Sequence, residues 1–172
     1  LYGPLIHFAG RTMGESFSAA FLVLALERID AAREKPWQVA ALGGALLGCA
    51  VVTRYGSAVV VLAALLWLLA TRSWKPLLLT VLGGLGVALA LGALDLATWG
   101  APFHSLRKYV EFNLTSGQAA AQFGSEPWWF YLPLLGWLVL WAWPALVLGL
   151  MRRAEGVSLF AFCGLAYVIA IS

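Results

Sequence analysis

The sequence predicts an all-α protein, a polytopic transmembrane helical bundle, on three observations. The 172 residues are 62% hydrophobic and only 11% charged, whereas soluble domains carry roughly a quarter charged residues. The mean hydropathy is +0.87. Apolar runs of helical length alternate with short charged or proline-containing connections, which is typical of consecutive membrane spans. We therefore expect a single transmembrane domain over residues 1–172.

The two ends of the sequence indicate an internal fragment of a longer chain. The first residues, LYGPLIHFAG, include no initiating Met and lack the positive stretch and cleavage site of a signal peptide. The last residues, LAYVIAIS, end inside an apolar run that is shorter than the roughly 20 residues a helix needs to cross a bilayer. We expect truncation at both ends.

The first half of the chain predicts a helix followed by a short apolar hairpin. Residues 13–26 begin a helix that runs into the charged stretch ERIDAAREKP, which Pro36 closes. Two short apolar segments follow, residues 38–53 and 56–71, with Arg54 and Tyr55 between them. Each segment is shorter than a standard span, so we expect a thin or tilted hairpin.

The second half predicts longer spans. Residues 76–98 form a full-length apolar segment, residues 128–151 form another, and the next begins at residue 157. Small residues lie four positions apart within the spans, a spacing that lets helices approach closely in lipid. They predict a compact bundle and are Gly44, Gly48, Gly84, Ala88 and Gly92.

The distribution of Lys and Arg predicts the topology. One predicted side collects Arg28, Arg33, Lys35, Arg72, Lys75, Arg152 and Arg153, and the other side collects Arg11, Arg54, Arg107 and Lys108. By the positive-inside rule the first side is cytoplasmic. The loop over residues 99–127 therefore faces outward, to a non-cytoplasmic compartment.

This outer loop predicts an interfacial helix over residues 102–114. Its apolar face carries Phe103, Leu106, Val110 and Leu114, and its polar face carries His104, Arg107, Lys108 and Glu111. Such a helix lies in the membrane interface, where its cations meet headgroups or a lipid phosphate. The alternative is a surface anchor whose charges are only solvated.

An aromatic cluster, QFGSEPWWFYLP, follows this helix and contains Trp128 and Trp129. Trp and Tyr at a span boundary commonly form an aromatic belt. A Trp pair can also stack on a sugar ring. Both interpretations place the cluster at the outer interface.

Four ionisable residues lie at or near the outer ends of spans and are candidates for a site, since such groups are costly at membrane depth. Arg11 and Glu15 are four residues apart, which also suits a simple helical ion pair. Arg54 lies at the tip of the hairpin, and Asp95 lies one turn before Trp99. The alternative for each cation is a side chain that extends to the surface.

The sequence lacks the signatures of several other kinds of site. His7 and His104 are isolated, and Cys49 and Cys163 have no metal-ligand spacing, so we predict no metal site or cofactor within the fragment. A divalent cation stays open for the full-length protein. The chain has no GxSxG, GxxxxGK[ST] or GxGxxG pattern, which argues against hydrolase, P-loop and dinucleotide chemistry.

The outer segment contains a recognisable order of residues. These are, along the chain, Asp95, Trp99-Gly100, Tyr109, Phe112-Asn113, Ser116-Gly117, Phe123-Gly124, Pro127-Trp128 and Tyr131. This order resembles the luminal segment of the glycosyltransferase family 22 mannosyltransferases, which extend GPI anchors and lipid-linked N-glycan precursors. Upstream, GRTMGES resembles the Arg-Thr-rich helix start of that family and TRYGS resembles its Arg-containing hairpin tip. The Ala- and Leu-rich composition suggests a bacterial relative.

The resemblance implies a GT-C fold and an inverting membrane glycosyltransferase. Such an enzyme moves a sugar, here mannose, from a polyprenyl-phosphate donor to a glycan or glycolipid acceptor on the non-cytoplasmic side. A carboxylate acts as the general base, and the resemblance implies that it lies upstream of Leu1. The implied partners are the donor, the acceptor and membrane lipids, without nucleic acid. The implied location is the bacterial inner membrane, or the ER membrane in a eukaryote.

The resemblance also implies roles for residues in this chain. Arg107 and Lys108, with Arg11 or Arg54, would stabilise the charge of the donor phosphate. Sugar or phosphate oxygens would be oriented by His104, Tyr109 and Asn113, and the acceptor groove would be shaped by Trp128 and Trp129. Two alternatives stay open, namely a transporter or flippase of lipid-linked sugars and a non-catalytic membrane scaffold.

Overall fold

The computed structural model describes residues 14–32, 38–124, 133, 159, 162–164 and 166. Its elements are, in order, α2 (Gly14–Ala31), α3 (Val39–Thr53), the 3₁₀ turn η1 (Tyr55–Ser57), α4 (Ala58–Ala70), α5 (Trp74–Trp99), α6 (His104–Val110), the π-helical turn η2 (Glu111–Thr115) and α7 (Gln118–Phe123). The described part of the chain contains helices and no strand, in agreement with the all-α prediction.

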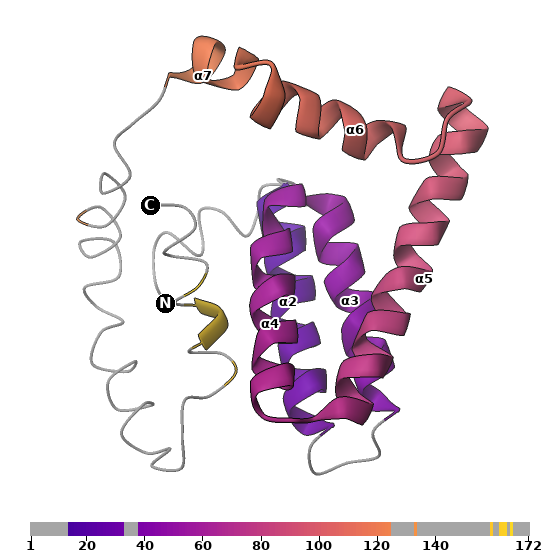
Figure 1. Ribbon diagram of the computed structural model, residues 1–172, viewed down its shortest axis with the longest axis vertical. Coiled ribbons are helices and arrows are strands. Elements are labelled where there is room, and N and C mark those ends of the chain that lie inside the picture. Colours follow the sequence, from indigo (N-terminus) through magenta and orange to yellow (C-terminus); the bar gives the residue numbers. More distant parts are fainter. Residues whose placement is uncertain are drawn as a thin grey trace.

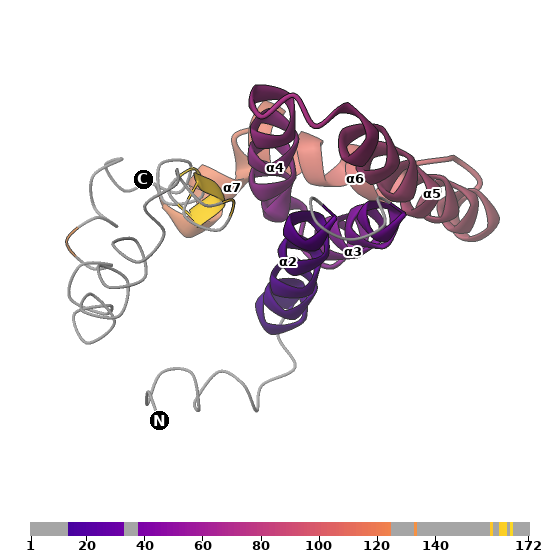
Figure 2. The ribbon, with the colours of Figure 1, turned by 90° about the horizontal axis from the view of Figure 1, so that it is seen from below.

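Helices α2 to α5 run in alternating directions (Figure 1), and α3 packs between α2 and α5 (Figure 2). The core between them is apolar and includes the fully buried side chains of Ile29, Leu47 and Leu68. Leu159 and Cys163, from the far end of the sequence, join the same core.

Glycines bring α3 and α5 into backbone contact. A Cβ on Gly44 would overlap the backbone of Thr80, and a Cβ on Gly83 would overlap the carbonyl oxygen of Ala41. Neither position accepts a larger residue without a shift of the helices. The close packing predicted from the small-residue spacing is confirmed at Gly44, and Gly83 is an additional contact that the spacing did not include.

Helix α5 is long and apolar enough to cross a membrane, as predicted for residues 76–98. It has 26 residues, which correspond to a length of about 39 Å. An 18-residue window within it has a mean hydropathy of 2.3. The helix begins two residues before Pro76, because the N–H groups of a first turn have no intrahelical partner and proline is tolerated there. Gly100, at φ 73, ends it. Among the described residues, α5 is the one helix with the length and composition of a membrane span. Helices α3 and α4 are shorter apolar helices, as predicted for residues 38–53 and 56–71.

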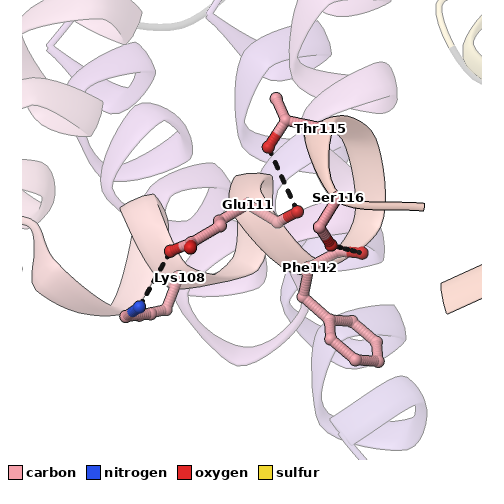
Figure 3. A network of polar contacts seen from close by, with 5 residues as sticks. All are labelled: Lys108, Glu111, Phe112, Thr115 and Ser116. Atoms are coloured by element: carbon pink, nitrogen blue, oxygen red, sulfur yellow. Dashed lines mark hydrogen bonds and ion pairs between the residues drawn. The ribbon is translucent and has the colours of Figure 1, made fainter. Parts of the chain in front are cut away.

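The helix predicted over residues 102–114 has different bounds in the structure. It begins at His104, because Phe103 adopts a left-handed conformation with φ 55. After Val110 it continues as the π-helical turn η2, in which the Ser116 N–H donates to the Glu111 carbonyl at 2.9 Å. The hydroxyl of Thr115 also donates to the Glu111 carbonyl (Figure 3), a contact that competes with regular helical bonds.

Helix α6 runs from the end of α5 past the tip of the α3–α4 hairpin (Figure 1), where Tyr109 contacts Tyr55. The short helix α7 follows it and was not predicted from the sequence. The predicted spans over residues 128–151 and from residue 157 onward lie outside the described residues, apart from isolated positions.

Candidate functional site

The tip of the α3–α4 hairpin carries an ion pair between distant parts of the chain. Arg54 is extended, with φ −153 and ψ 106, and its Nη1 lies 2.6 Å from Oε1 of Glu15 in the first turn of α2. The two side chains are 41% and 58% exposed. Arg11, the partner that the helical spacing predicted for Glu15, lies outside the described residues, and Glu15 has Arg54 as its partner in the structure.

Buried serines lie below this ion pair. The Ser18 hydroxyl donates to the Ala50 carbonyl at 3.1 Å and shares a hydrogen bond of 2.5 Å with the Ser57 hydroxyl. Because both serines are 2% exposed, these bonds satisfy polar groups that would otherwise be costly to bury. They tie α2 to the hairpin tip and hold Glu15 and Arg54 side by side.

A cavity of about 380 Å³ opens beside the pair. Its lining is polar at the ion pair and the serines and apolar along α2 and α4, and it includes Glu15, Ser18, Arg54, Ser57, Leu22 and Val60. A second, more apolar groove of about 350 Å³ lies between α3, α4 and α5 and is lined in part by Tyr55, Phe103 and Leu106. The hairpin tip therefore adjoins both spaces.

Asp95 forms the contact between α5 and α6. Its carboxylate accepts hydrogen bonds from the Ser105 N–H at 2.8 Å and from the Ser105 hydroxyl at 2.7 Å. The residue is 3% exposed. Sequence reasoning predicted Asp95 as a substrate-binding residue, and the structure gives both of its oxygens a partner within the protein.

Aromatic contacts position two further candidates. Tyr109 of α6 packs against Tyr55 of the hairpin tip, with ring centroids 4.8 Å apart and an interplanar angle of 44°. His104 stacks on Trp99 at 5.2 Å and 11°. Burial raises the pKa of the Tyr55 phenol, the nearby charge of Asp95 raises it further, and a hydrogen bond with Ser105 lowers it. The Tyr55 phenol is thus neutral at physiological pH and next to the α5–α6 contact.

The cations of α6 are exposed. Lys108 Nζ lies 2.8 Å from Oε2 of Glu111 (Figure 3), and this hydrogen bond and the charge of Lys108 lower the pKa of Glu111. Arg107 forms no ion pair with any residue in the described part of the chain. Asn113, in η2, donates from Nδ2 to the Tyr109 carbonyl at 3.0 Å.

Sequence reasoning and the structure agree only in part about this region. The structure brings Glu15, Arg54, Asp95 and Tyr109 together around Tyr55 at the end of the bundle where α6 lies. It leaves Arg107 and Lys108 exposed. Tyr55, Ser105 and the two buried serines were not predicted as site residues, although Tyr55 directly follows Arg54. Trp128 and Trp129 lie outside the described residues. No group of three or more His, Cys, Asp or Glu within the described ranges could hold a metal ion.

Comparison with known proteins gives one finding. The model of the Alg9-like mannosyltransferase family matches residues 4–172. No curated protein and no solved structure matches the chain.

Proposed function

Because the chain belongs to the Alg9-like mannosyltransferase family, we propose that it transfers mannose from a polyprenyl-phosphate donor to a glycan or glycolipid acceptor. The observation that carries the proposal is the family match over nearly the whole chain. The general reaction type, glycosyl transfer, follows from the family. The donor, the acceptor and the side of the membrane are parts of the proposal.

The hairpin tip supports a lipid-phosphate donor. Arg54 lines a cavity that is also lined by apolar residues of α2 and α4, so one space offers a cation next to apolar surface. A polyprenyl phosphate has the matching chemistry, with an anionic head on an apolar chain. The guanidinium has five N–H donors, and the bond to Glu15 leaves donors for phosphate oxygens.

In the reaction we propose, the acceptor hydroxyl oxygen attacks the anomeric carbon of the mannose. The bond from that carbon to the phosphate oxygen breaks, and the polyprenyl phosphate leaves with the electron pair. A general base takes the hydroxyl proton, and we expect this base outside residues 1–172. Arg54, with Arg107 and Lys108 of α6, stabilises the negative charge that develops on the phosphate.

The outward orientation of this end is also part of the proposal. Arg28 lies in the last turn of α2, Arg72 follows α4, and Lys75 lies in the first turn of α5. Figure 1 shows these helix ends on the side of the bundle opposite to α6. This separation supports a cytoplasmic end and a non-cytoplasmic, substrate-binding end. Together with the 26-residue apolar helix α5, it supports a multi-pass protein, and we propose a bacterial inner membrane as its location.

The test is a transfer assay with the full-length protein in detergent or lipid nanodiscs. We expect radiolabelled mannose to move from polyprenyl-phosphate-mannose to a glycolipid acceptor and not from GDP-mannose. Inversion at the anomeric carbon is read by NMR of the product. Movement of the intact lipid-linked sugar across proteoliposomes without transfer would instead identify a flippase and overturn the proposal.

A further inference from the structure

We propose that Asp95 is a positioning residue for mannosyl transfer, which fixes α6 across the hairpin tip so that the cations of α6 and Arg54 act on one substrate. The inference rests on the proposed function. It assigns Asp95 a role within the protein instead of a contact with substrate.

The two oxygens of Asp95 hold a single residue of α6. Oδ2 accepts from the Ser105 N–H at 2.8 Å, and Oδ1 accepts from the Ser105 hydroxyl at 2.7 Å. The Ser105 N–H belongs to the first turn of α6, where backbone donors have no intrahelical partner, and Phe103, at the N-cap position, makes no side-chain capping bond. The carboxylate of the preceding helix therefore caps α6, through charge-assisted bonds that are stronger than neutral ones.

The turn between α5 and α6 has a defined geometry. Phe103 has φ 55, a conformation that is an outlier for a bulky residue and persists only where surrounding contacts over-determine it. Its ring lies against Gly92 of α5, where an added Cβ would be 2.8 Å from Cζ of the ring. Together with Asp95 and Ser105, this contact makes two attachments between α5 and the start of α6.

A third attachment joins α6 to the hairpin tip. Tyr109, one turn after Ser105, packs on Tyr55 with ring centroids 4.8 Å apart, and Tyr55 follows Arg54 in the chain. The direction in which α6 leaves α5 determines whether this ring contact forms. Loss of the Asp95–Ser105 bonds should therefore separate Arg107 and Lys108 from Arg54 without removing any cation.

Two variants and two controls test the inference. Asp95→Asn keeps the shape of the side chain, removes its charge and one acceptor, and leaves the hydrogen bond between Tyr55 and Ser105 in place. Ser105→Ala removes the hydroxyl bonds to both Asp95 and Tyr55 and keeps the backbone N–H bond. Ser105→Thr keeps both donors and serves as the conservative variant. Thr98→Ala is the matched control, since the Thr98 hydroxyl bonds a carbonyl of its own helix at 2.8 Å and the residue is exposed.

The first readout is the Tyr55–Tyr109 contact in the full chain in nanodiscs. Brief photo-oxidation joins neighbouring tyrosine rings as dityrosine, and mass spectrometry quantifies the linked peptide. The second readout is the donor KM and the kcat of mannosyl transfer. We expect about tenfold less dityrosine and an about tenfold higher donor KM in Asp95→Asn, smaller changes in the same direction in Ser105→Ala, and wild-type values in Ser105→Thr and Thr98→Ala.

Three results would overturn the inference. Unchanged dityrosine in both Asp95→Asn and Ser105→Ala would show that the bonds do not position α6. Lost transfer with unchanged dityrosine would make Asp95 a substrate contact. If Asp95→Asn does not fold, unchanged dityrosine in Ser105→Ala alone would show that the bonds do not position α6. A wild-type protein that transfers no mannose would refute the proposed function, whereas the dityrosine comparison would still decide the role of Asp95.

Discussion

Replacing Arg54 by Ala should separate the chemical role of the guanidinium from its structural role. The Arg54–Glu15 pair is 2.6 Å long, but its side chains are 41% and 58% exposed. Exposed pairs contribute roughly 0.2–1 kcal/mol to stability. Since 1 kcal/mol corresponds to roughly 2–4 °C in Tm for a chain of this size, Arg54→Ala should lower Tm by no more than about 4 °C.

The effect on mannosyl transfer should be much larger. A hydrogen bond to a charged group contributes roughly 1.5–3 kcal/mol, and each 1.36 kcal/mol is tenfold in rate. If Arg54 binds the donor phosphate, kcat/KM should fall by roughly 10- to 150-fold in the polyprenyl-phosphate-mannose assay. Arg54→Lys should recover part of this loss, because it restores the charge without the planar fork.

Glu15→Gln is the matched control, since it removes the same ion pair and leaves the guanidinium in place. It should have nearly wild-type transfer and a Tm shift similar to that of Arg54→Ala. Wild-type transfer in Arg54→Ala would refute the role of Arg54. An equal loss in Glu15→Gln would show that the ion pair itself, and not the guanidinium, determines activity.

Three further predictions concern α6 and the helix packing. The double variant Arg107→Ala/Lys108→Ala should lower mannosyl transfer at least about tenfold. Its Tm should change little, because both side chains are exposed. Wild-type turnover in this variant would show that the two cations are not part of the site. The single variant Lys108→Ala should raise the pKa of Glu111 toward its ordinary value of 4.5, as read from the carboxyl carbon shift in NMR. Because the folded pKa is lowered, the Lys108–Glu111 contact stabilises α6 above pH 4.5 and this contribution disappears as the pH falls through the lowered value. Gly83→Ala should destabilise the fold by about 1–3 kcal/mol through overlap with the α3 backbone. Gly86→Ala is the control and should be neutral, because the space around Gly86 is open. Equal Tm values for the two variants would contradict the close contact between α3 and α5.

The helices were the most predictable part of the structure. Hydropathy alone located α3, α4 and α5, because each apolar run ends at a charged or helix-breaking residue. Helix bounds were less accurate where side chains changed the local bonding. Helix α6 begins two residues later than predicted, after the left-handed Phe103. The end of the predicted helix is the π-helical turn η2, in which the Thr115 hydroxyl bonds the Glu111 carbonyl.

The contacts of the candidate site could not be derived from local pattern. The fold brings Arg54 to Glu15 from the next hairpin, a pairing that no spacing within one helix indicates, whereas the Arg11 pairing suggested by helical spacing lies outside the described residues. The partner of Asp95 also could not be predicted from helical spacing, because Ser105 lies ten residues away across the turn between α5 and α6. Such pairs depend on how helices pack, and spacing within one helix does not encode that packing.

The most direct test of the account is transfer by the purified full-length protein from radiolabelled polyprenyl-phosphate-mannose, compared between wild type and Arg54→Ala. The account predicts labelled glycolipid with the wild type, none from GDP-mannose, and at least about tenfold less with Arg54→Ala. Absence of transfer by a folded wild-type protein across glycan and glycolipid acceptors, or transfer from GDP-mannose alone, would contradict it.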